Sequence, residues 1–400
     1  MKAVILAAGE GSRMRPLTQS RPKVMLPVAG KPIMEHLIDE IVRAGIREFV
    51  LVVGYEEARV REYFGDGRSR VISIEYRTQP RATGTASAVG MVKDTVGGPF
   101  LVINGDSIIA GSDIARVAQL QGNQLGVKRV ERPEQFGVVE LEGERVVRIH
   151  EKSANPPSNL ANAGLYLFTP DIFDAIAATA VSPRGEYELP AAIDALIARG
   201  HPVGISYIES WLEMSYPWDL LTVGEKLMAD LESRNEGAIE ENVAVHGALR
   251  LGKGSRIRSG AYINGPVIIG ENCDIGPNCF LRGSTVIGDG CHIGAGVEVK
   301  NSIVMNGSKI PHLSYIGDSV IGENCNLGAG TKIANLRLDK KNVLIGSLDT
   351  GRRKLGAIIG DGVQTGINCS INTGTVIGGG AWIGPGAVAK GNIAAGARVF

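Results

Sequence analysis

The chain has 400 residues, 44% of them hydrophobic, which is enough for two or three domains with cores of their own. Lys plus Arg and Asp plus Glu both total 42, so no net field would hold the protein to nucleic acid or to an anionic membrane. No apolar stretch reaches the ~18 residues of a transmembrane helix, and no signal peptide is apparent. We therefore expect a cytoplasmic protein, with neither nucleic acid nor membrane as a partner, that meets any anionic ligand at a local site.

Up to about residue 225 the sequence alternates short aliphatic runs with amphipathic stretches. The alternation predicts a parallel or mixed sheet covered by helices, that is, a Rossmann-like α/β domain. Three of the later runs have no helix between them and predict a meander or a side lobe. The predicted strands are 2–7, 48–53, 71–76, 99–103, 136–141, 145–150 and 163–168, and the predicted helices are 33–44, 85–96, 189–199 and 218–235.

After residue 238 aliphatic residues recur every six positions, from Ile239 to Met305, and the pattern resumes after breaks near residues 311–315 and 337–357. A six-residue period fits neither a helix nor a long strand. It predicts a left-handed parallel β-helix of triangular section, with three hexads in each coil and about seven coils in all. The predicted domains are thus an α/β domain at 1–225, a helical linker at 226–238 and a hexapeptide-repeat β-helix at 239–400.

The five cysteines form no CxxC pair, which argues against disulfides and zinc. All of them occupy the fifth place of a hexad, at Cys273, Cys279, Cys291, Cys325 and Cys369. This position predicts small, buried corner residues with a structural role.

A glycine-rich turn follows the first predicted strand, within residues 6–27 (LAAGEGSRMRPLTQSRPKVMLP). It lacks the third glycine of a dinucleotide fingerprint and the Gly-Lys-Ser/Thr of a P-loop, and alone it could be an ordinary strand–helix turn. Arg13 and Lys23 lie in the same loop, which three prolines stiffen. Two cations beside exposed backbone N–H groups suit a polyphosphate whose charge grows during phosphoryl transfer.

Two further segments carry candidate ligand residues. Residues 78–85 (TQPRATGT) open a predicted helix, where Gln79 could read a base edge and Gly84 would allow close backbone approach. The alternative is a plain helix start with a Thr cap. Asp106 ends the run 100–106 (FLVINGD), at the sheet edge where α/β proteins bind ligands, and it could be a magnesium ligand or a turn former.

Together these stretches resemble the sugar-phosphate nucleotidyltransferase family over residues 1 to about 225. Further matching motifs are Phe-Gly-Val at 136–138, Glu-Lys at 151–152, Asn-Ala-Gly at 162–164 and Trp-Leu-Glu at 211–213. The resemblance implies Mg²⁺-dependent attack of a sugar 1-phosphate on the α-phosphorus of a nucleoside triphosphate, UTP or dTTP, with release of pyrophosphate. It implies roles for catalytic Arg13 and Lys23, nucleotide-binding Leu6, Ala8, Gly9, Gly11, Gln79, Gly84 and Thr85, sugar-phosphate-binding Gly137, Glu151, Lys152 and Asn162, and metal-binding Asp106 and Glu213. The family often has Asp or Asn where this chain has Glu213.

The first break in the hexads contains His312 and Tyr315, in what we expect to be a loop bulging from the coils. Functional residues concentrate in such loops, and a neutral imidazole suits general-base work. The stretches 312–318 (HLSYIGD) and 324–331 (NCNLGAGT) resemble the acetyltransferase half of bifunctional UDP-N-acetylglucosamine pyrophosphorylase / glucosamine-1-phosphate acetyltransferases, in their archaeal-type form. That resemblance implies acetyl-CoA as co-substrate, a homotrimer with the acetyl site at subunit contacts, and a site formed with catalytic His312 by Arg282, Lys300, Tyr315, Asn326, Asn335 and Lys341.

Two alternatives remain open from the sequence. The chain could be a monofunctional nucleotidyltransferase for glucose or mannose 1-phosphate whose β-helix only assembles or regulates it, since Arg282 and Lys341 match by spacing more than by local sequence. It could also be a non-catalytic assembly subunit like those of translation factors, although Arg13, Lys23 and Asp106 together argue against this.

Overall fold

The computed structural model describes residues 1–400, which divide into two compact units. One comprises Met1–Glu10, Arg21–Met25 and Pro32–Glu213, and is called the α/β unit below. The other comprises Gly11–Ser20, Leu26–Lys31 and Met214–Phe400, and is called the β-helix unit. No helix combines the length and the apolar character that crossing a membrane requires.

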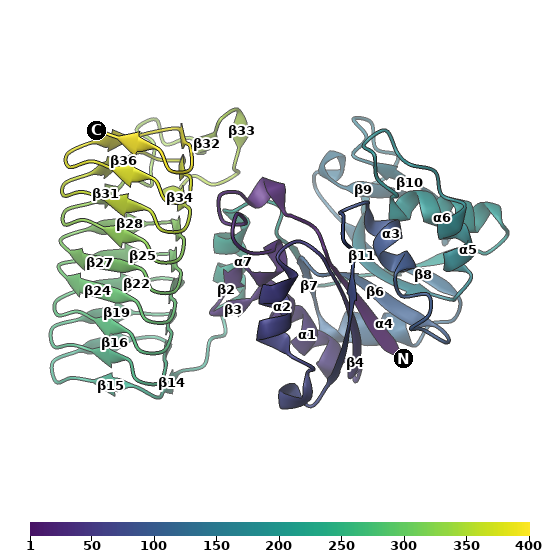
Figure 1. The fold of residues 1–400 in the computed structure, drawn as a ribbon, viewed down its shortest axis with the longest axis horizontal. Coiled ribbons are helices and arrows are strands. Elements are labelled where there is room, and N and C mark those ends of the chain that lie inside the picture. The colour runs from purple at the N-terminus through teal and green to yellow at the C-terminus, as the bar shows by residue number, and fades with distance from the viewer. The chain divides into compact units, whose positions relative to one another are not determined.

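A mixed nine-stranded sheet forms the centre of the α/β unit (Figure 1). β1 pairs in parallel with β4 and β6, whereas β11 runs antiparallel to β6 and β8. The strands, in sheet order, are β5 (Ser73–Thr78), β4 (Glu48–Val53), β1 (Lys2–Ala7), β6 (Phe100–Asn104), β11 (Leu160–Phe168), β8 (Asn123–Arg129), β12 (Val203–Tyr207), β10 (Arg145–Glu151) and β9 (Gly137–Glu142). The predicted mixed sheet is confirmed, but β9, β10 and β11 do not form a simple meander, because β11 pairs with β9 and not with β10.

Helices cover both faces of this sheet because successive strand residues point to opposite sides. Ile5 of β1 enters a core with α1 (Ile33–Arg43), α2 (Glu57–Phe64) and α4 (Gly111–Ala118). Its neighbour Val4 enters a core with α3 (Thr85–Gly90), α5 (Ile172–Ala177) and α6 (Leu189–Ala198). The predicted helix at 85–96 is shorter than expected, since the chain continues from Gly90 to Thr95 in single turns.

The first half of the chain also contains two pairs of short strands. β7 (Ser107–Ile109) pairs antiparallel with β13 (Trp211–Glu213). β2 (Pro27–Val28) and β3 (Lys31–Pro32) form a small hairpin. The β7–β13 pair matters below because it joins two predicted metal ligands.

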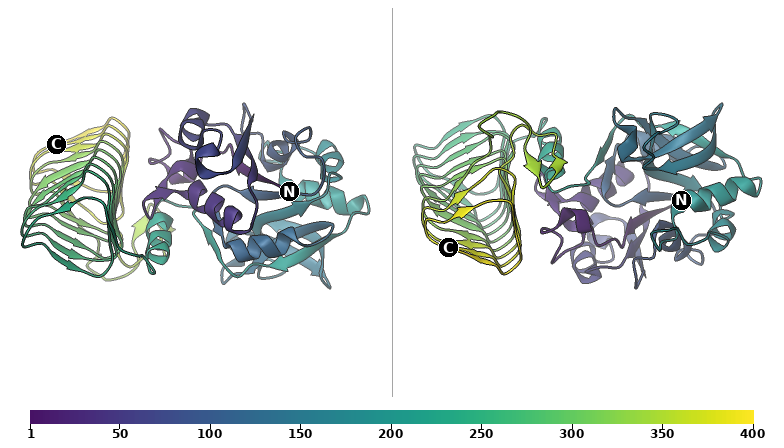
Figure 2. Two further views of the ribbon diagram at one scale, coloured as in Figure 1. Left: turned by 90° about the horizontal axis from the view of Figure 1, so that it is seen from below. Right: turned by 90° about the horizontal axis from the view of Figure 1, so that it is seen from above.

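The rest of the β-helix unit is built of three stacks of short parallel strands, visible side-on in Figure 1 and along the stack in Figure 2. Each coil contributes one strand to each sheet, which is the arrangement of a parallel β-helix. Residues 18 apart pair in the first coils, as Ile257 does with Ile275 and Ile275 with Ile293, so the predicted coil of three hexads is confirmed. The inward aliphatic residues form one continuous core that includes all five cysteines.

The first sheet of the β-helix contains β14 (Arg234–Asn235), β17 (Leu249–Leu251), β20 (Val267–Ile269), β23 (Thr285–Ile287), β26 (Ile303–Val304), β29 (Val320–Ile321), β34 (Ala357–Ile359), β37 (Thr375–Ile377) and β40 (Asn392–Ile393). The second contains β15 (Ala238–Ile239), β18 (Arg256–Ile257), β21 (Asp274–Ile275), β24 (His292–Ala295), β27 (Lys309–His312), β30 (Asn326–Leu327), β35 (Gln364–Thr365), β38 (Trp382–Ile383) and β41 (Arg398–Val399). The third contains β16 (Ala244–His246), β19 (Tyr262–Asn264), β22 (Phe280–Arg282), β25 (Glu298–Lys300), β28 (Tyr315–Gly317), β31 (Lys332–Ile333), β36 (Ser370–Ile371) and β39 (Val388–Ala389).

Two sheets have nine strands and the third has eight, so the expected seven coils were too few. The extra strands arise where the hexad pattern is faint. α7 (Asp219–Leu227) ends earlier than the predicted helix 218–235, and Arg234–Asn235 already pairs with Arg250–Leu251 as the first rung. Residues 226–238 are therefore mostly non-helical.

The two breaks in the hexad pattern have different structures. Near His312 the expected bulging loop is wrong, because His312 is the last residue of β27 and pairs with Ala295 of the preceding coil. The pattern breaks there because some steps between inward residues are one residue short, as from Ile316 to Ile321, while the coils remain continuous. Residues 334–356 are a true insertion that contains the hairpin β32 (Leu344–Ile345) and β33 (Leu348–Asp349).

Candidate active sites

The loop after β1 begins with Ala8, whose backbone lies close to the chain that follows β4. Gly54 allows this approach, since a Cβ there would lie 2.8 Å from the Gln79 carbonyl oxygen and 3.0 Å from that of Ala8. The Tyr55 backbone N–H also donates to the Ala8 carbonyl. Ala8 and Gln79, both predicted nucleotide-binding residues, are thus brought together by a glycine that the motif analysis did not single out.

Gly11 starts the segment that bears Arg13. It adopts a left-handed conformation (φ 64°) and precedes a short 3₁₀ helix at Ser12–Met14. The Thr18 hydroxyl donates a 2.9 Å hydrogen bond back to the Gly11 carbonyl, which closes the loop on itself. Arg13 is exposed, and its guanidinium lies 5.8 Å from the ring centroid of Tyr216.

Lys23 lies in direct contact with Asp106. Its ammonium nitrogen is 2.6 Å from Asp106 Oδ2, and only 7% of the residue is exposed. Asp106 follows β6 in a turn whose Gly105 N–H donates to the Leu6 carbonyl. The structure therefore joins the end of β1, the end of β6 and the lysine of the glycine-rich loop at the carboxyl edge of the sheet, where parallel sheets bind ligands.

Glu213 approaches the same turn through the β7–β13 pair. It is in register with Ser107, the residue directly after Asp106. No group of three or more His, Cys, Asp or Glu side chains is gathered anywhere in the chain as a metal site. Two carboxylates fit Mg²⁺, which is usually held by one or two carboxylates while substrate phosphates and water complete its shell.

The predicted nucleobase segment is held by a neighbouring loop. Gln79 is 5% exposed and its amide nitrogen donates to the Gly84 carbonyl at 3.1 Å. A Cβ at Gly84 would lie 2.3 Å from the Tyr187 carbonyl oxygen, and the Tyr187 N–H donates to the Thr83 carbonyl. The Thr85 hydroxyl accepts a hydrogen bond from the Leu189 N–H, at the start of α6.

The motif analysis did not single out this loop, residues 182–188. No motif marks it, and the available signal was the glycine at position 84, which only a close backbone contact would explain. The loop also contains Arg184, which forms an ion pair with Glu188 at 2.9 Å. It therefore links the predicted nucleobase segment to charged groups near the predicted sugar site.

The predicted sugar-phosphate residues lie on or next to the strands β9, β10 and β11. Gly137 pairs with Glu151 across β9 and β10, and a Cβ at Gly137 would lie 2.6 Å from Glu151 Oε1. Asn162 is next to Ala161, which pairs with Val138, and its side chain binds the Gly164 N–H and the Tyr166 hydroxyl. Lys152 continues β10 in a left-handed conformation (φ 46°).

Desolvation and a neighbouring charge shift the pKa of Glu151 in opposite directions. Desolvation raises the pKa of its carboxyl above the usual range, and the Arg184 guanidinium opposes this shift. A carboxylate set between an arginine and a glycine-lined strand can accept hydrogen bonds from sugar hydroxyls.

In the β-helix unit, a buried carboxylate connects three of the predicted acetyltransferase residues. Asp318 is 2% exposed and its Oδ2 accepts from Lys300 Nζ at 2.8 Å and from Asn335 Nδ2 at 2.6 Å. Asn335 also donates to the Tyr315 hydroxyl at 3.1 Å. Asp318 lies within the motif at 312–318, but the sequence assigns it no role, because a buried carboxylate that joins several side chains cannot be recognised before its partners are known.

Arg282 extends this group along the third sheet. It is in register with Lys300, one coil further on, and its guanidinium lies 3.4 Å from Glu298. Burial raises the pKa of the Tyr315 hydroxyl, as do the Glu298 and Asp318 carboxylates, so the phenol stays protonated near neutral pH.

The remaining predicted acetyltransferase residues lie elsewhere. His312 and Asn326 are exposed residues of β27 and β30, which belong to the second sheet. Lys341 is exposed on the insertion, where its N–H donates to Asp339. One chain therefore distributes the predicted acetyl site over two sheets and the insertion.

The fold and these groupings define a two-part protein, a nucleotide-binding type of α/β sheet followed by a parallel β-helix. The comparisons with known proteins agree. A model described as Nucleotidyl transferase matches residues 2–228, and one described as GMPPB C-terminal domain matches residues 263–379. The chain belongs to the nucleotidyl transferase family, and it is a sugar-1-phosphate nucleotidyltransferase.

Its relatives span nearly the whole chain. It is 40% identical to the Bifunctional protein GlmU of Methanocaldococcus jannaschii, over 96% of this chain and 93% of the relative. It is also 40% identical to the Bifunctional sugar-1-phosphate nucleotidylyltransferase/acetyltransferase of Sulfurisphaera tokodaii, over 97% of each chain. Among solved structures, a Bacillus anthracis protein assigned as a glucose-1-phosphate thymidylyltransferase is 29% identical, has a TM-score of 0.53, and covers 59% of this chain and 98% of its own.

Proposed function

We propose that this nucleotidyltransferase couples UTP or dTTP to N-acetylglucosamine 1-phosphate or glucose 1-phosphate, and also acetylates glucosamine 1-phosphate from acetyl-CoA. The contact of Lys23 with Asp106 at 2.6 Å is the observation that supports the first activity most strongly. A buried lysine paired with a carboxylate at the ligand-binding edge of an α/β sheet is ready to exchange that partner for phosphate oxygens.

In the first reaction an oxygen of the sugar phosphate attacks the α-phosphorus of the nucleotide. A new P–O bond forms while the bond to the β-phosphate oxygen breaks, and its electron pair leaves with pyrophosphate. Lys23 and Arg13 would hold the triphosphate and stabilise the growing charge, while Gln79 and Gly84 position the base. Positioning and charge neutralisation account for most of the catalysis in reactions of this kind.

Asp106 and Glu213 would hold Mg²⁺ beside the triphosphate. When bound, the ion supplies charge neutralisation on the phosphates and on the leaving pyrophosphate. The sugar phosphate would lie against Gly137, Glu151, Lys152 and Asn162. Desolvation raises the pKa of the Glu151 carboxyl, whereas the charge of Arg184 lowers it and so favours the carboxylate, which can accept hydrogen bonds from sugar hydroxyls.

In the second reaction the amine nitrogen of the sugar attacks the thioester carbon of acetyl-CoA. A C–N bond forms and the C–S bond breaks, while His312 accepts the amine proton and passes it to the departing sulfur, so that coenzyme A leaves as the thiol. Lys300, Arg282 and Lys341 would hold the phosphate, and Tyr315, Asn326 and Asn335 would orient the sugar. The two bifunctional relatives support this activity, as does the cluster around Asp318.

Two assays on the purified protein test the proposal. Pyrophosphate release is measured for four nucleoside triphosphates against several sugar 1-phosphates, and loss of free amine is measured with glucosamine 1-phosphate and acetyl-CoA. We expect Lys23→Ala to lower pyrophosphate release by 10²-fold or more, the scale of removing one transition-state cation, with its melting temperature showing that the variant folds. Unchanged pyrophosphate release in this variant would refute the first site.

The competing proposal is a monofunctional nucleotidyltransferase with a structural or regulatory β-helix. It is favoured by the separation of His312 and Asn326 from the Asp318 cluster, on a different sheet of the same chain. We expect His312→Ala to lower acetyl transfer by about 10²–10⁴-fold, the usual contribution of a general base. If the wild-type protein consumes no amine, the monofunctional proposal replaces the bifunctional one.

A further inference from the structure

The loop Gly11–Ser20, which follows β1 and bears Arg13, belongs to the same compact unit as the β-helix. Its last residues contact the turns of late coils. The Ser20 hydroxyl donates to Asp361 Oδ2, in the turn after β34, and the Gly379 N–H donates to Gln19 Oε1 at 3.4 Å. A Cβ on Gly360 would lie 3.0 Å from the Cβ of Pro16, so the Pro16 side chain also lies close to this turn.

Hydrogen bonds within the loop join its beginning to its end, so a restraint on its last residues also restrains its middle. The Thr18 hydroxyl holds the Gly11 carbonyl, and the Met14 N–H donates to the same oxygen. Met14, Leu17 and Thr18 are almost completely buried. A restraint at Ser20 is therefore transmitted through a rigid, buried turn to Gly11 and Arg13.

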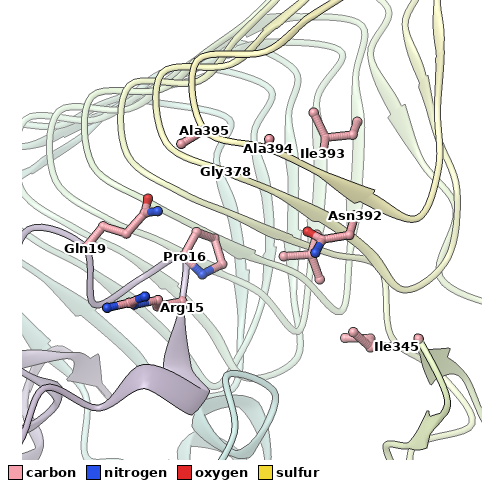
Figure 3. A pocket seen from close by; sticks show the side chains of 11 residues that line it. Arg15, Pro16, Gln19, Ile345, Gly378, Asn392, Ile393, Ala394 and Ala395 are labelled. Atoms are coloured by element: carbon pink, nitrogen blue, oxygen red, sulfur yellow. The ribbon is translucent and has the colours of Figure 1, made fainter.

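Polar contacts, together with the close approach of Pro16, attach the loop to the coils. A cavity of about 460 Å³ lies between them, lined on the loop side by Arg15, Pro16 and Gln19 and on the coil side chiefly by Val376, Asn392 and Ile393. In Figure 3, Pro16 lies across this space from Asn392 and Ile393. Because an open cavity provides little van der Waals contact, the hydrogen bonds at Ser20 and Gln19 have a large share in positioning the loop.

Asp361 also forms a hydrogen bond within the β-helix, through its other carboxylate oxygen. Its Oδ1 accepts from the Glu323 N–H of the preceding coil at 2.8 Å. Asp289 makes the same contact with the Glu271 N–H at 2.7 Å, several coils away. The turn-to-turn bond therefore uses Oδ1, and Oδ2 of Asp361 is the oxygen that meets the loop.

We propose that Asp361 and Ser20 are positioning residues for nucleotidyl transfer, through which the β-helix sets the conformation of the loop that presents Arg13 to the triphosphate. This inference rests on the proposed function of Arg13. It gives the β-helix a part in the first reaction that is separate from any acetyl transfer.

The test measures initial rates of pyrophosphate release while nucleoside triphosphate and sugar 1-phosphate are varied in turn. We expect Ser20→Ala to raise the KM for the triphosphate about fivefold, the effect of losing one partly exposed hydrogen bond to a charged group. Asp361→Asn removes the charge but leaves an amide that can donate to the Ser20 hydroxyl, and should raise this KM by less. The KM for the sugar phosphate should stay unchanged. Ser20→Thr, which keeps the hydroxyl, should restore the wild-type value.

Asp289→Asn is the matched control, because Asn can still accept the turn-to-turn bond at both positions. It should leave both KM values and the melting temperature at wild-type values. The double variant Ser20→Ala/Asp361→Asn should be no worse than Ser20→Ala alone, because both changes act on the same contact.

Three results would overturn the inference. They are wild-type triphosphate KM in both single variants, an equal change in Asp289→Asn, or full additivity in the double variant. Failure of the proposed function gives a different pattern, since Lys23→Ala would then release pyrophosphate as fast as the wild type.

Discussion

At position 84 the backbone leaves no room for a side chain. Gly84 has φ 109°, a region that favours glycine, and the Tyr187 backbone occupies the space of a Cβ at 2.3 Å. The backbone that leaves no space for a side chain here belongs to a loop about a hundred positions further along the chain. A single glycine thus determines how closely the predicted nucleobase segment approaches its neighbour.

We expect Gly84→Ala to destabilise the α/β unit by about 1–3 kcal/mol, through backbone strain and displacement of the 182–188 loop. The KM for the nucleoside triphosphate should rise more than the KM for the sugar phosphate. Gly97→Ala is the control, since a Cβ at Gly97 meets nothing within 4 Å. Thermal unfolding and steady-state kinetics check both, and equal behaviour of the two variants would contradict the prediction.

The cysteines show the opposite case, in which a reactive group is kept inert by its surroundings. All five are free and buried in the core of the β-helix, as their hexad position predicts. Burial raises the pKa of Cys279 and Cys291 to about 12 and that of Cys325 to about 11. Since the thiolate is the reactive form, these thiols should be unreactive at neutral pH.

We expect a thiol reagent at pH 8 to label none of the five cysteines in the native protein, and all five after unfolding in guanidinium chloride. Because the raised pKa values keep the folded thiols protonated well above pH 8, modest alkalinisation should not change this. Mass spectrometry of the labelled protein counts the modified residues. Rapid labelling of a native cysteine would show that the coils open locally.

At the scale of elements, the stacked coils depend on rows of identical inward residues. Ile257, Ile275 and Ile293 lie in register in successive strands of one sheet and are completely buried. Each coil can bury its face only against its neighbours, so a defect in one coil weakens those on both sides.

Ile293→Ala should therefore lower the stability of the β-helix by about 2–5 kcal/mol, the usual cost of a buried Ile→Ala change. Ile367→Ala removes the same atoms from a residue that is 56% exposed and should cost less than about 0.5 kcal/mol. Denaturant unfolding followed by circular dichroism compares the two. A similar loss in both would mean that the turns, and not the inward rows, determine the stability.

At the scale of the whole molecule, the predicted acetyl site is the feature that a single chain does not complete. Its residues divide between two sheets and the insertion. The same unit has exposed apolar residues in a turn, in the insertion and in β39, namely Leu313 (65% exposed), Leu338 (104%) and Val388 (64%). Apolar side chains exposed in this way are suited to cover by other copies of the chain.

We accordingly expect a homotrimer in solution, with His312 of one copy near the Asp318 cluster of another. Light scattering coupled to gel filtration measures the mass, to be compared with 42.2 kDa for one chain. Leu338→Asp, on the insertion, should weaken the assembly and lower acetyl transfer more than pyrophosphate release. A monomeric protein with full acetyl transfer would contradict this model of the site.

The sequence by itself determined the features that depend on local pattern. The six-residue period predicts the β-helix because each inward position repeats within one coil, and the alternating runs predict the mixed sheet because burial on both faces requires apolar strands. Motif order also indicates which residues belong to the nucleotidyltransferase part. The period failed near His312, where short steps change the spacing without opening the coil.

Only the tertiary structure decided which of these residues meet. Lys23 contacts Asp106, Gly84 contacts Tyr187, and Asp318 contacts Lys300 and Asn335, each between segments well separated in the sequence. The same holds for the loop Gly11–Ser20, which the chain order assigns to the first half and the packing assigns to the β-helix unit. The physical reason is that hydrophobic periodicity acts over neighbouring residues, whereas contacts between polar side chains depend on register and on the turns that bring distant segments together.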